Sequence, residues 1–169
     1  MKVEIPESVE AVRKLLYAFN EGYAKRDLNS LEDFMNIFTQ NDHLEFIGIG
    51  GVLPGRGAWC LGKEAVQKLI RSDWDYWGQI VIDAENARID VHNNIAWVST
   101  AATLSTFDET EEFLGDKVEV VGKIHPVSPG DTRIKPLRMT AVLVKLEDQW
   151  QFQQIHFSYS VRSLPRQNS

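Results

Sequence analysis

Three stretches in the first 77 residues repeat apolar side chains at steps of three and four, the spacing of one helical face. The first predicted helix starts at Pro6 and Glu7 and closes at 25–27, the second covers 29–38, and the third runs from Gly62 to Trp77. Their apolar faces consist of Val9, Val12, Leu16, Phe19 and Tyr23; Leu31, Phe34, Met35 and Phe38; and Val66, Leu69, Ile70, Trp74 and Trp77. Between the second and third helices we expect a short strand over 44–49 and a glycine-rich loop over 48–62.

After Gly78 the apolar period changes to two, which indicates strands. We expect them over 79–91, 94–107, 117–125, 134–146 and 149–162. Asn and Asp tolerate left-handed backbone, so His92-Asn93-Asn94 and Glu147-Asp148-Gln149 read as tight turns between antiparallel neighbours. The acidic stretch 108–116 and the proline-rich stretch 125–136 read as exposed connections. The pattern therefore predicts an α+β domain, with three helices on one face of a curved, mostly antiparallel sheet and a cavity between the two layers.

Composition narrows the function classes. The chain has 169 residues, 43% of them hydrophobic and 25% charged, as expected of a single globular domain over 1–169. It has no apolar run of membrane-spanning length and no pattern of a secretory signal. A net charge of -6 disfavours nucleic acid and anionic membranes as partners. Cys60 is the only cysteine, which excludes an internal disulfide and a cysteine-based zinc site and favours a cytoplasmic location.

No cofactor or metal is expected. The segment Gly57 to Glu64 has the spacing of a phosphate-binding loop, but Glu64 replaces the hydroxyl residue that would hold magnesium. A carboxylate at that place would also repel phosphate. The four histidines have no metal-ligand spacing.

The last two predicted strands carry the main candidate site. Alternation places on one face of the final strand Trp150, Phe152, Gln154, His156 and Ser158. The turn after the preceding strand brings Arg138 opposite Ser158 and Thr140 opposite His156. If this face is solvated, the cluster is a polar surface. If it faces the helices, which Trp150 favours, it is a polar floor suited to an organic anion or a carbonyl group.

Tryptophans and carboxylates near the third helix are further candidates. Trp59, in the glycine-rich loop, is expected to be a wall of the cavity. Asp73 and Asp75 flank Trp74, and they are either a carboxylate pair for acid–base chemistry or, as we favour, solvated residues at a helix end. The expected ligand-binding residues are Trp59, Trp74, Arg138, Thr140, Trp150, His156 and Ser158.

Several of these segments together resemble one known family. They are 19–22, 27–31, 44–47, 62–66 and Asp73-Trp74, and then 137–144 and 150–158, where Arg-x-Thr is followed by Trp and by His-x-Ser. In order and spacing the chain resembles the SnoaL-like branch of the nuclear transport factor 2-like (cystatin-like) superfamily. The resemblance implies a cone-shaped α+β barrel, a strongly bent sheet, a deep pocket and homodimers that pair through their sheets.

The resemblance does not imply one activity. Isomerase-like members carry a tyrosine in the first helix, where Phe19 stands here, and a general-base carboxylate on the first strand, where Phe46 and Ile47 stand. Glu45 would point to the other face, so this isomerase chemistry is not expected. The region 108–136 is longer than in minimal members, which suggests an extra hairpin or flap.

Three functions stay open at this stage. The leading one is a protein that binds a compact, partly apolar organic molecule with an anionic or carbonyl group. An enzyme of the isomerase, polyketide cyclase or dehydratase type would use His156 as general acid or base and Arg138 as electrostatic stabiliser. The third is an association module with a plugged pocket. A homodimer is expected through the sheet face opposite His156, formed by Gln151, Gln153, Ile155, Phe157 and Tyr159.

Overall fold

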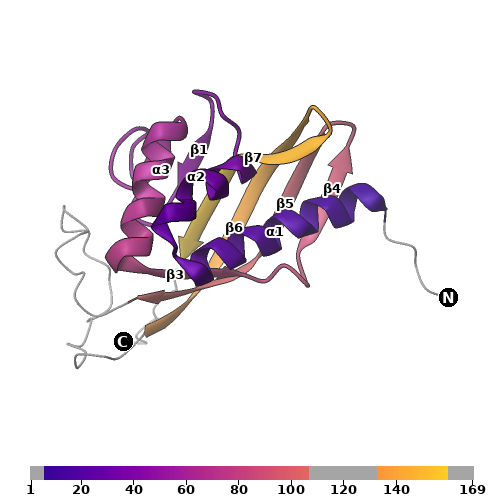
Figure 1. Ribbon diagram of the computed structural model, residues 1–169. Helices are drawn as coiled ribbons and strands as arrows, with labels where there is room; N and C mark the ends of the chain where they lie inside the picture. Colours follow the sequence, from indigo (N-terminus) through magenta and orange to yellow (C-terminus); the bar gives the residue numbers. More distant parts are fainter. Residues whose placement is uncertain (1–5, 107–132, 160–169) are drawn as a thin grey trace, which may run out of the picture.

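A computed structural model describes residues 6–106 and 133–159 of the chain (Figure 1). Its helical part consists of α1 (Glu7–Lys25), η1 (Leu28–Ser30), α2 (Leu31–Phe34), η2 (Met35–Ile37), α3 (Lys63–Ser72) and η3 (Asp73–Trp77). The first and third helices lie where their apolar periods predict them. The second is one α-helical turn between two 3-10 turns, and α3 ends in one turn of π-helix, η3.

The sheet has seven strands in the order β2-β1-β7-β6-β5-β3, and β4 also pairs with β5. The strands are β1 (Glu45–Ile47), β2 (Trp59–Leu61), β3 (Gly78–Ile82), β4 (Arg88–His92), β5 (Ile95–Thr106), β6 (Arg133–Leu146) and β7 (Gln149–Tyr159). All neighbours are antiparallel except β1 and β7. Helix α1 runs across the sheet and packs on β3, β4 and β7, as Figure 1 shows. The predicted α+β architecture, with three helices on a strongly curved, mostly antiparallel sheet, is confirmed.

Two predicted boundaries were wrong, and one predicted strand is not tested. The expected strand 79–91 is interrupted after Ile82, because the Asp83 carboxylate accepts the Asn86 backbone N–H at 3.2 Å and turns the chain. The expected loop 48–62 contains β2, whose three residues are too few for alternation to reveal. The expected strand 117–125 lies outside the described residues.

Both predicted hairpin turns are confirmed. Asn93 has φ 54°, and Glu147 and Asp148 have φ 47° and 64°, the left-handed values that such turns require. The pairing predicted across the second turn is also confirmed, with Arg138 opposite Ser158 and Thr140 opposite His156.

Strand β7 contains a β-bulge at Gln153. Leu143 pairs with Phe152, but the next residue of β6, Val142, pairs with Gln154, so one residue of β7 is inserted. Before the insertion Phe152 is fully buried, and after it Ile155 is fully buried, three positions later instead of two. A bulge of this kind reverses the alternation of the strand, and both halves of β7 thereby bury their apolar residues.

Helix α1 is bonded to the sheet edge by side chains. The Asn20 amide donates to the Ile82 carbonyl at 2.8 Å and accepts from the Ile82 N–H at 2.7 Å. The Arg13 guanidinium donates to the carbonyls of Ala84 and Glu85. These bonds fix α1 over β3 and the turn that follows it.

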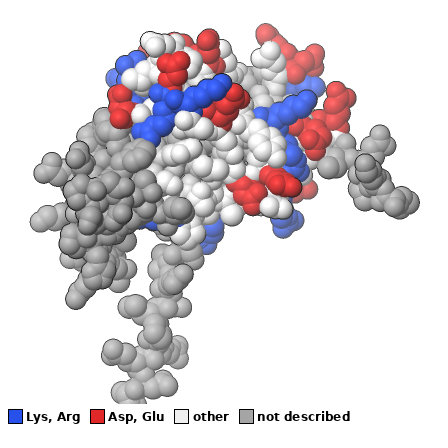
Figure 2. All heavy atoms as spheres, turned by 60° about the horizontal axis from the view of Figure 1, so that its bottom comes forward, with Lys and Arg blue, Asp and Glu red and all other residues white. Residues whose placement is uncertain are grey.

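The surface in Figure 2 carries mixed charge. Positive and negative side chains are interspersed at opposite ends of this face, with a broad uncharged area between them. In the part of the chain that the structure describes, no helix is long and apolar enough to cross a membrane.

Candidate functional site

The space between the helices and the inner face of the sheet is filled with aromatic rings. They are Phe19, Tyr23, Phe34, Phe38, Phe46, Trp74, Phe152 and Phe157, and none is more than 9% exposed. Phe19 and Tyr23 stack at 4.7 Å between ring centroids, and the Phe34 and Trp74 rings lie 4.9 Å apart. Phe38 and Phe152 continue the cluster at 5.6 Å. These ring contacts connect α1, α2, η3 and β7 in one apolar environment.

A glycine lets α2 approach α1 closely. A Cβ atom at Gly22 would lie 2.2 Å from ring carbons of Phe34, far inside van der Waals contact. The Phe34 ring therefore packs directly against the bare backbone of α1 at Gly22. The aromatic cluster depends on glycine at this position.

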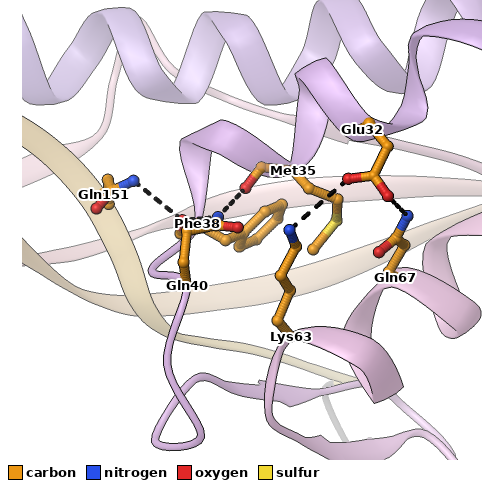
Figure 3. A network of polar contacts seen from close by, with 7 residues as sticks. All are labelled: Glu32, Met35, Phe38, Gln40, Lys63, Gln67 and Gln151. Carbon is orange, nitrogen blue, oxygen red and sulfur yellow. Dashed lines mark hydrogen bonds and ion pairs between the residues drawn. The ribbon is translucent and has the colours of Figure 1, made fainter.

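Polar side chains donate hydrogen bonds to the backbone that follows α2, next to the aromatic cluster (Figure 3). Gln40 donates to the carbonyls of Met35 and Phe38 at 2.8 and 2.7 Å, and Gln151 donates to the same Phe38 carbonyl at 3.1 Å. These bonds add to the one helical bond of η2, in which the Met35 carbonyl accepts the Phe38 N–H at 3.1 Å, and they satisfy the Phe38 carbonyl just after η2. They fix the backbone that carries the Phe38 ring.

The same network joins α2 to α3. The Glu32 carboxylate accepts from the Gln67 amide at 2.9 Å and lies 3.7 Å from the Lys63 ammonium. Figure 3 shows both partners reaching Glu32 from α3. The aromatic cluster is thus covered by two helices that are bonded to each other.

One hydrogen-bonded acid pair lies inside this apolar environment. The Tyr23 hydroxyl, on the last turns of α1, donates to Oδ2 of Asp73 at 2.8 Å. Tyr23 is 0% exposed and Asp73 is 5% exposed. Asp73 is the first residue of η3, and π-turns inside helices occur often at functional sites.

Burial controls the ionisation of the pair. It raises the pKa of Asp73 to about 7, although the Tyr23 hydrogen bond and the positive charge of Arg26 act to lower it. Burial and the Asp73 charge raise the pKa of Tyr23 well above its usual value. Near neutral pH the Asp73 carboxyl group can therefore both hold and release a proton, while Tyr23 remains a donor.

The neighbours of the pair include one thiol and one unpaired indole. Burial raises the pKa of Cys60 to about 11, with a further contribution from the Asp73 charge, so this thiol stays neutral. Among the described residues, Nε1 of Trp74 and Oγ1 of Thr39 are buried without a hydrogen-bond partner. Such atoms are rare in folded proteins, and an oxygen of a bound molecule could accept from the Trp74 N–H.

The predicted inward orientation of Arg138 and His156 is wrong. Arg138 and Thr140 are exposed and alternate with the buried Leu137 and Met139. His156 and Ser158 are half-buried and flank the buried Phe157. The bulge at Gln153 is the cause, because it places the side chains of His156 and Ser158 on the face of β7 opposite Trp150. The sheet brings the four residues together, but on its outer face.

The tryptophans divide between the two faces. Trp59 was expected in the cavity wall, but its Nε1 donates to Glu45 at 2.6 Å on the outer face, since Cys60 takes the inward position of β2. Glu45 faces outward, as expected from its position beside the buried Phe46. Trp74 and Trp150 lie on the inner side, 4% and 7% exposed.

The surface predicted for dimerisation is also corrected. Ile155 and Phe157 are 0% and 1% exposed and belong to the core, so they cannot form an outer contact. The exposed apolar residues of the outer face are instead Leu61, Val81, Ile95, Trp97 and Leu146, at 41% to 50% exposure.

Sequence reasoning passed over the Tyr23–Asp73 pair. Tyr23 was assigned to the apolar face of the first helix, and Asp73 was expected to be solvated. Of the two carboxylates that flank Trp74, Asp73 is buried and Asp75 is exposed. Asp73 continues the buried positions Val66 and Ile70 at steps of four and three, and this spacing was the available signal. A second signal was a tyrosine, with a polar hydroxyl, in an otherwise apolar helix face.

The described residues offer no evident metal site. Among them, no three His, Cys, Asp or Glu side chains gather where they could hold a metal ion.

Comparison with known proteins finds a matching family model and solved structures of similar fold. A model described as a SnoaL-like domain matches residues 12–162. No curated protein matches the sequence. A nuclear transport factor 2-like superfamily protein from Salmonella enterica has a TM-score of 0.66 and 12% identity, covering 95% of this chain and 96% of its own.

Two further solved structures carry provisional enzyme names. One is a provisionally named dehydratase of the NTF2-like family from Streptomyces avermitilis, with a TM-score of 0.62, 15% identity and coverage of 92% and 97%. The other is a protein provisionally named a scytalone dehydratase, from Novosphingobium aromaticivorans, with a TM-score of 0.60, 15% identity and coverage of 96% and 95%. At these identities the likeness concerns the fold alone.

Proposed function

The chain belongs to the SnoaL-like domain family, and from that premise we propose that it binds a small, mainly apolar molecule. The carbonyl oxygen of this molecule would lie at the hydrogen-bonded pair of Tyr23 and Asp73. The observation that carries the proposal is the 2.8 Å hydrogen bond between these two side chains inside an aromatic cluster. Small-molecule sites combine an apolar lining with a few convergent polar groups, and this cluster has that composition.

The hydrogen-bonding atoms favour a neutral carbonyl over an anion. Protonated Asp73 donates one hydrogen bond, and the unpaired Trp74 N–H supplies a second donor. Ionised Asp73 would repel a bound carboxylate or phosphate. The proposal therefore transfers the polar role from Arg138 and His156 to Tyr23 and Asp73, keeps Trp150 as an apolar wall, and keeps Trp74 as a wall that also offers its N–H.

The same pair suits acid–base catalysis, which keeps an enzyme as the alternative within this proposal. A carboxyl group with a pKa of about 7 gives and takes protons near neutral pH. An isomerase, cyclase or dehydratase acting on a carbonyl compound needs such a group. The provisional dehydratase names of the two relatives above agree with this alternative.

Binding can be tested with a neutral fluorescent ketone, propionyl-dimethylaminonaphthalene. The protein is labelled with fluorotryptophan and titrated while fluorine NMR follows its five tryptophans. We expect the Trp74 signal to shift, because Trp74 lies beside Tyr23, and the Trp97 signal on the outer face to stay unchanged. A shift of Trp97 alone would overturn the proposal.

A matched ligand isolates the carbonyl contact. The analogue with a propyl group in place of the propionyl group keeps the apolar body and loses the oxygen. We expect the parent protein to prefer the ketone by about tenfold, the value of one good hydrogen bond. The double variant Tyr23→Phe with Asp73→Leu removes the acid pair and keeps the Trp74 N–H, so its preference for the ketone should be much smaller than that of the parent. An unchanged ketone preference in this variant contradicts the proposal.

A second candidate function is favoured by the outer face of the sheet. The filled aromatic interior and the exposed Trp97 and Ile95, each 50% exposed, suit an association module, and we propose a homodimer formed through this face.

We also propose a cytoplasmic location for the protein. Its single cysteine, Cys60, is buried, which agrees with that location.

Sedimentation of the parent and of Trp97→Asp separates the two candidates. We expect a dimer at micromolar concentration that dissociates in the variant, because a carboxylate at the interface would be buried without a partner. A monomeric parent would rule out the association module. An unchanged ketone affinity in Trp97→Asp would show that ligand binding is independent of association.

A further inference from the structure

Arg26, the residue that follows α1, contacts the π-turn η3, which also contains Asp73, the hydrogen-bond partner of Tyr23. Arg26 closes α1 with φ 50°, a left-handed conformation in which glycine or asparagine is usual. Its backbone N–H donates to the Gly22 carbonyl at 2.9 Å. A non-glycine residue with this φ is held there by its surroundings.

The Arg26 guanidinium reaches the backbone of η3. Its Nε donates to the Trp74 carbonyl at 2.8 Å, and its Nη2 donates to the Asp73 carbonyl at 2.9 Å. The Asp73 carbonyl also accepts the Gly78 N–H that closes the π-turn. One turn of α1 therefore contacts Asp73 twice, through the Tyr23 hydroxyl on its carboxyl group and through Arg26 on its carbonyl.

We propose that Arg26 is the positioning residue of the Tyr23–Asp73 site: its guanidinium fixes the π-turn that presents Asp73 and keeps a positive charge beside the carboxyl group. The inference rests on the proposed function for its ligand readout, but the contacts on which it stands do not. Arginine suits this task because its planar fork spans two acceptors at once, whereas a lysine ammonium acts as a point charge.

The charges around Asp73 define the direction of the effect. The groups that influence it are the Tyr23 hydroxyl of α1 and the guanidinium of Arg26, the residue that follows α1, while the Cys60 thiol of β2 is close enough for the Asp73 charge to raise the pKa of Cys60. Burial raises the pKa of Asp73, and Arg26 opposes that rise. Removing the charge of Arg26 therefore raises the pKa of Asp73 further, and the carboxyl group stays protonated to higher pH.

Two variants separate position from charge. Arg26→Gln removes the charge and the fork, and Arg26→Lys removes the fork and keeps the charge. Arg13→Gln is the matched control, because Arg13 lies on the same helix and also donates to two backbone carbonyls, those of Ala84 and Glu85. Thermal melts confirm that each variant is folded.

The first readout needs no ligand. NMR of the side-chain carboxyl carbons follows the titration of Asp73 in each protein. We expect its midpoint to rise in Arg26→Gln and to stay near the parent value in Arg26→Lys and Arg13→Gln. An unmoved midpoint in Arg26→Gln overturns the inference, whatever the protein binds.

The second readout is the pH profile of affinity for the fluorescent ketone. Well below the Asp73 midpoint both Arg26 variants should bind about fivefold more weakly than the parent, the effect of a displaced hydrogen bond. The fall in affinity at higher pH should move upward in Arg26→Gln alone. If the parent affinity does not depend on pH, the proposed function fails, while the ligand-free titration still tests Arg26. If both Arg26 variants bind as tightly as the parent at low pH, the positioning role is overturned.

Discussion

The two faces of strand β7 differ in the chemistry that they offer. The inner face buries Trp150 and Phe152 before the bulge and Ile155 and Phe157 after it, all against the helices. The outer face of the second half carries His156 and Ser158 beside the exposed Arg138 and Thr140 of β6. The outer residues are of types common in catalytic sites, but they are exposed or half-buried on the sheet surface. The polar groups whose pKa values burial raises are Tyr23 and Asp73, which come from helices.

This difference shows that residue type and position weigh unequally in the choice of a site. Arg138 is exposed, and its Nη2 donates to the Tyr159 carbonyl at 2.6 Å, a contact of the sheet surface. Asp73 is a single carboxyl group, but its burial in a ring cluster raises its pKa to about 7. Water screens the charge of the exposed Arg138. The exclusion of water around Asp73 strengthens the electrostatic interactions of its carboxyl group.

Deleting Gln153 should have the largest effect, because it removes the insertion that separates the two faces. Either Trp150 and Phe152 or Ile155 and Phe157 would then turn outward, and polar side chains would enter the core. We expect the variant not to fold, since the loss approaches the total stability of about 5–15 kcal/mol of a domain. Circular dichroism and urea unfolding measure this.

The control for the deletion is Gln153→Ala. It keeps the inserted residue and removes the side-chain bonds of Gln153, which donates to the His43 carbonyl at 2.6 Å and accepts from the Asn41 amide at 3.5 Å. It should fold with a loss of about 1 kcal/mol or less. A deletion variant as stable as this control would show that the bulge does not determine the two faces.

Asp73→Asn should change the pH dependence of stability by an intermediate amount. Folding raises the pKa of Asp73 from 3.8 to about 7, so the folded state holds the proton more tightly than the unfolded state. The stabilisation from protonated Asp73 is complete below about pH 4 and is lost as pH rises to about 7, at up to about 1.4 kcal/mol per pH unit. The variant should lack this loss.

Urea unfolding across that pH range measures the effect as the difference between parent and variant. Asp75→Asn is the matched control, because Asp75 lies two residues away and is exposed. It should retain the parent dependence on pH. Equal pH dependence in the parent and Asp73→Asn would mean that folding does not raise the pKa of Asp73.

Substitutions on the outer face should have the smallest effect. We expect Arg138→Ala and His156→Ala each to change the free energy of unfolding by about 0.5 kcal/mol or less and to leave the ketone affinity unchanged. Phe157→Ala, at the neighbouring inward position, should lose about 3–5 kcal/mol of stability. A loss of ketone binding in His156→Ala would return the site to the outer face.

Local signals explain which parts of this fold the sequence predicts. The helices follow from apolar spacing, and the pairing of Thr140 with His156 follows from a turn whose residues adopt positive φ. The bulge at Gln153 adds one residue among several glutamines and leaves no mark in the composition. The orientation of everything after it depends on packing between β7 and the helices, which are distant in sequence.

The candidate site is predictable only in part for the same reason. Trp74 was expected inside because it lies in an apolar helix face. The Tyr23–Asp73 bond joins residues 50 positions apart, and a π-turn, η3, begins at Asp73. Apolar periodicity alone does not reveal such a turn.

The bonds of Asn20 to Ile82 also bear on aggregation. Strand β3 is the last strand of the sheet, and an open edge of this kind accepts strands from other molecules. The Asn20 amide offers one donor and one acceptor, as a peptide unit does, and occupies both backbone groups of Ile82. A helix side chain thus takes the place of an incoming strand. Position 20 protects the protein from edge-to-edge association and takes no part in the acid pair one turn away.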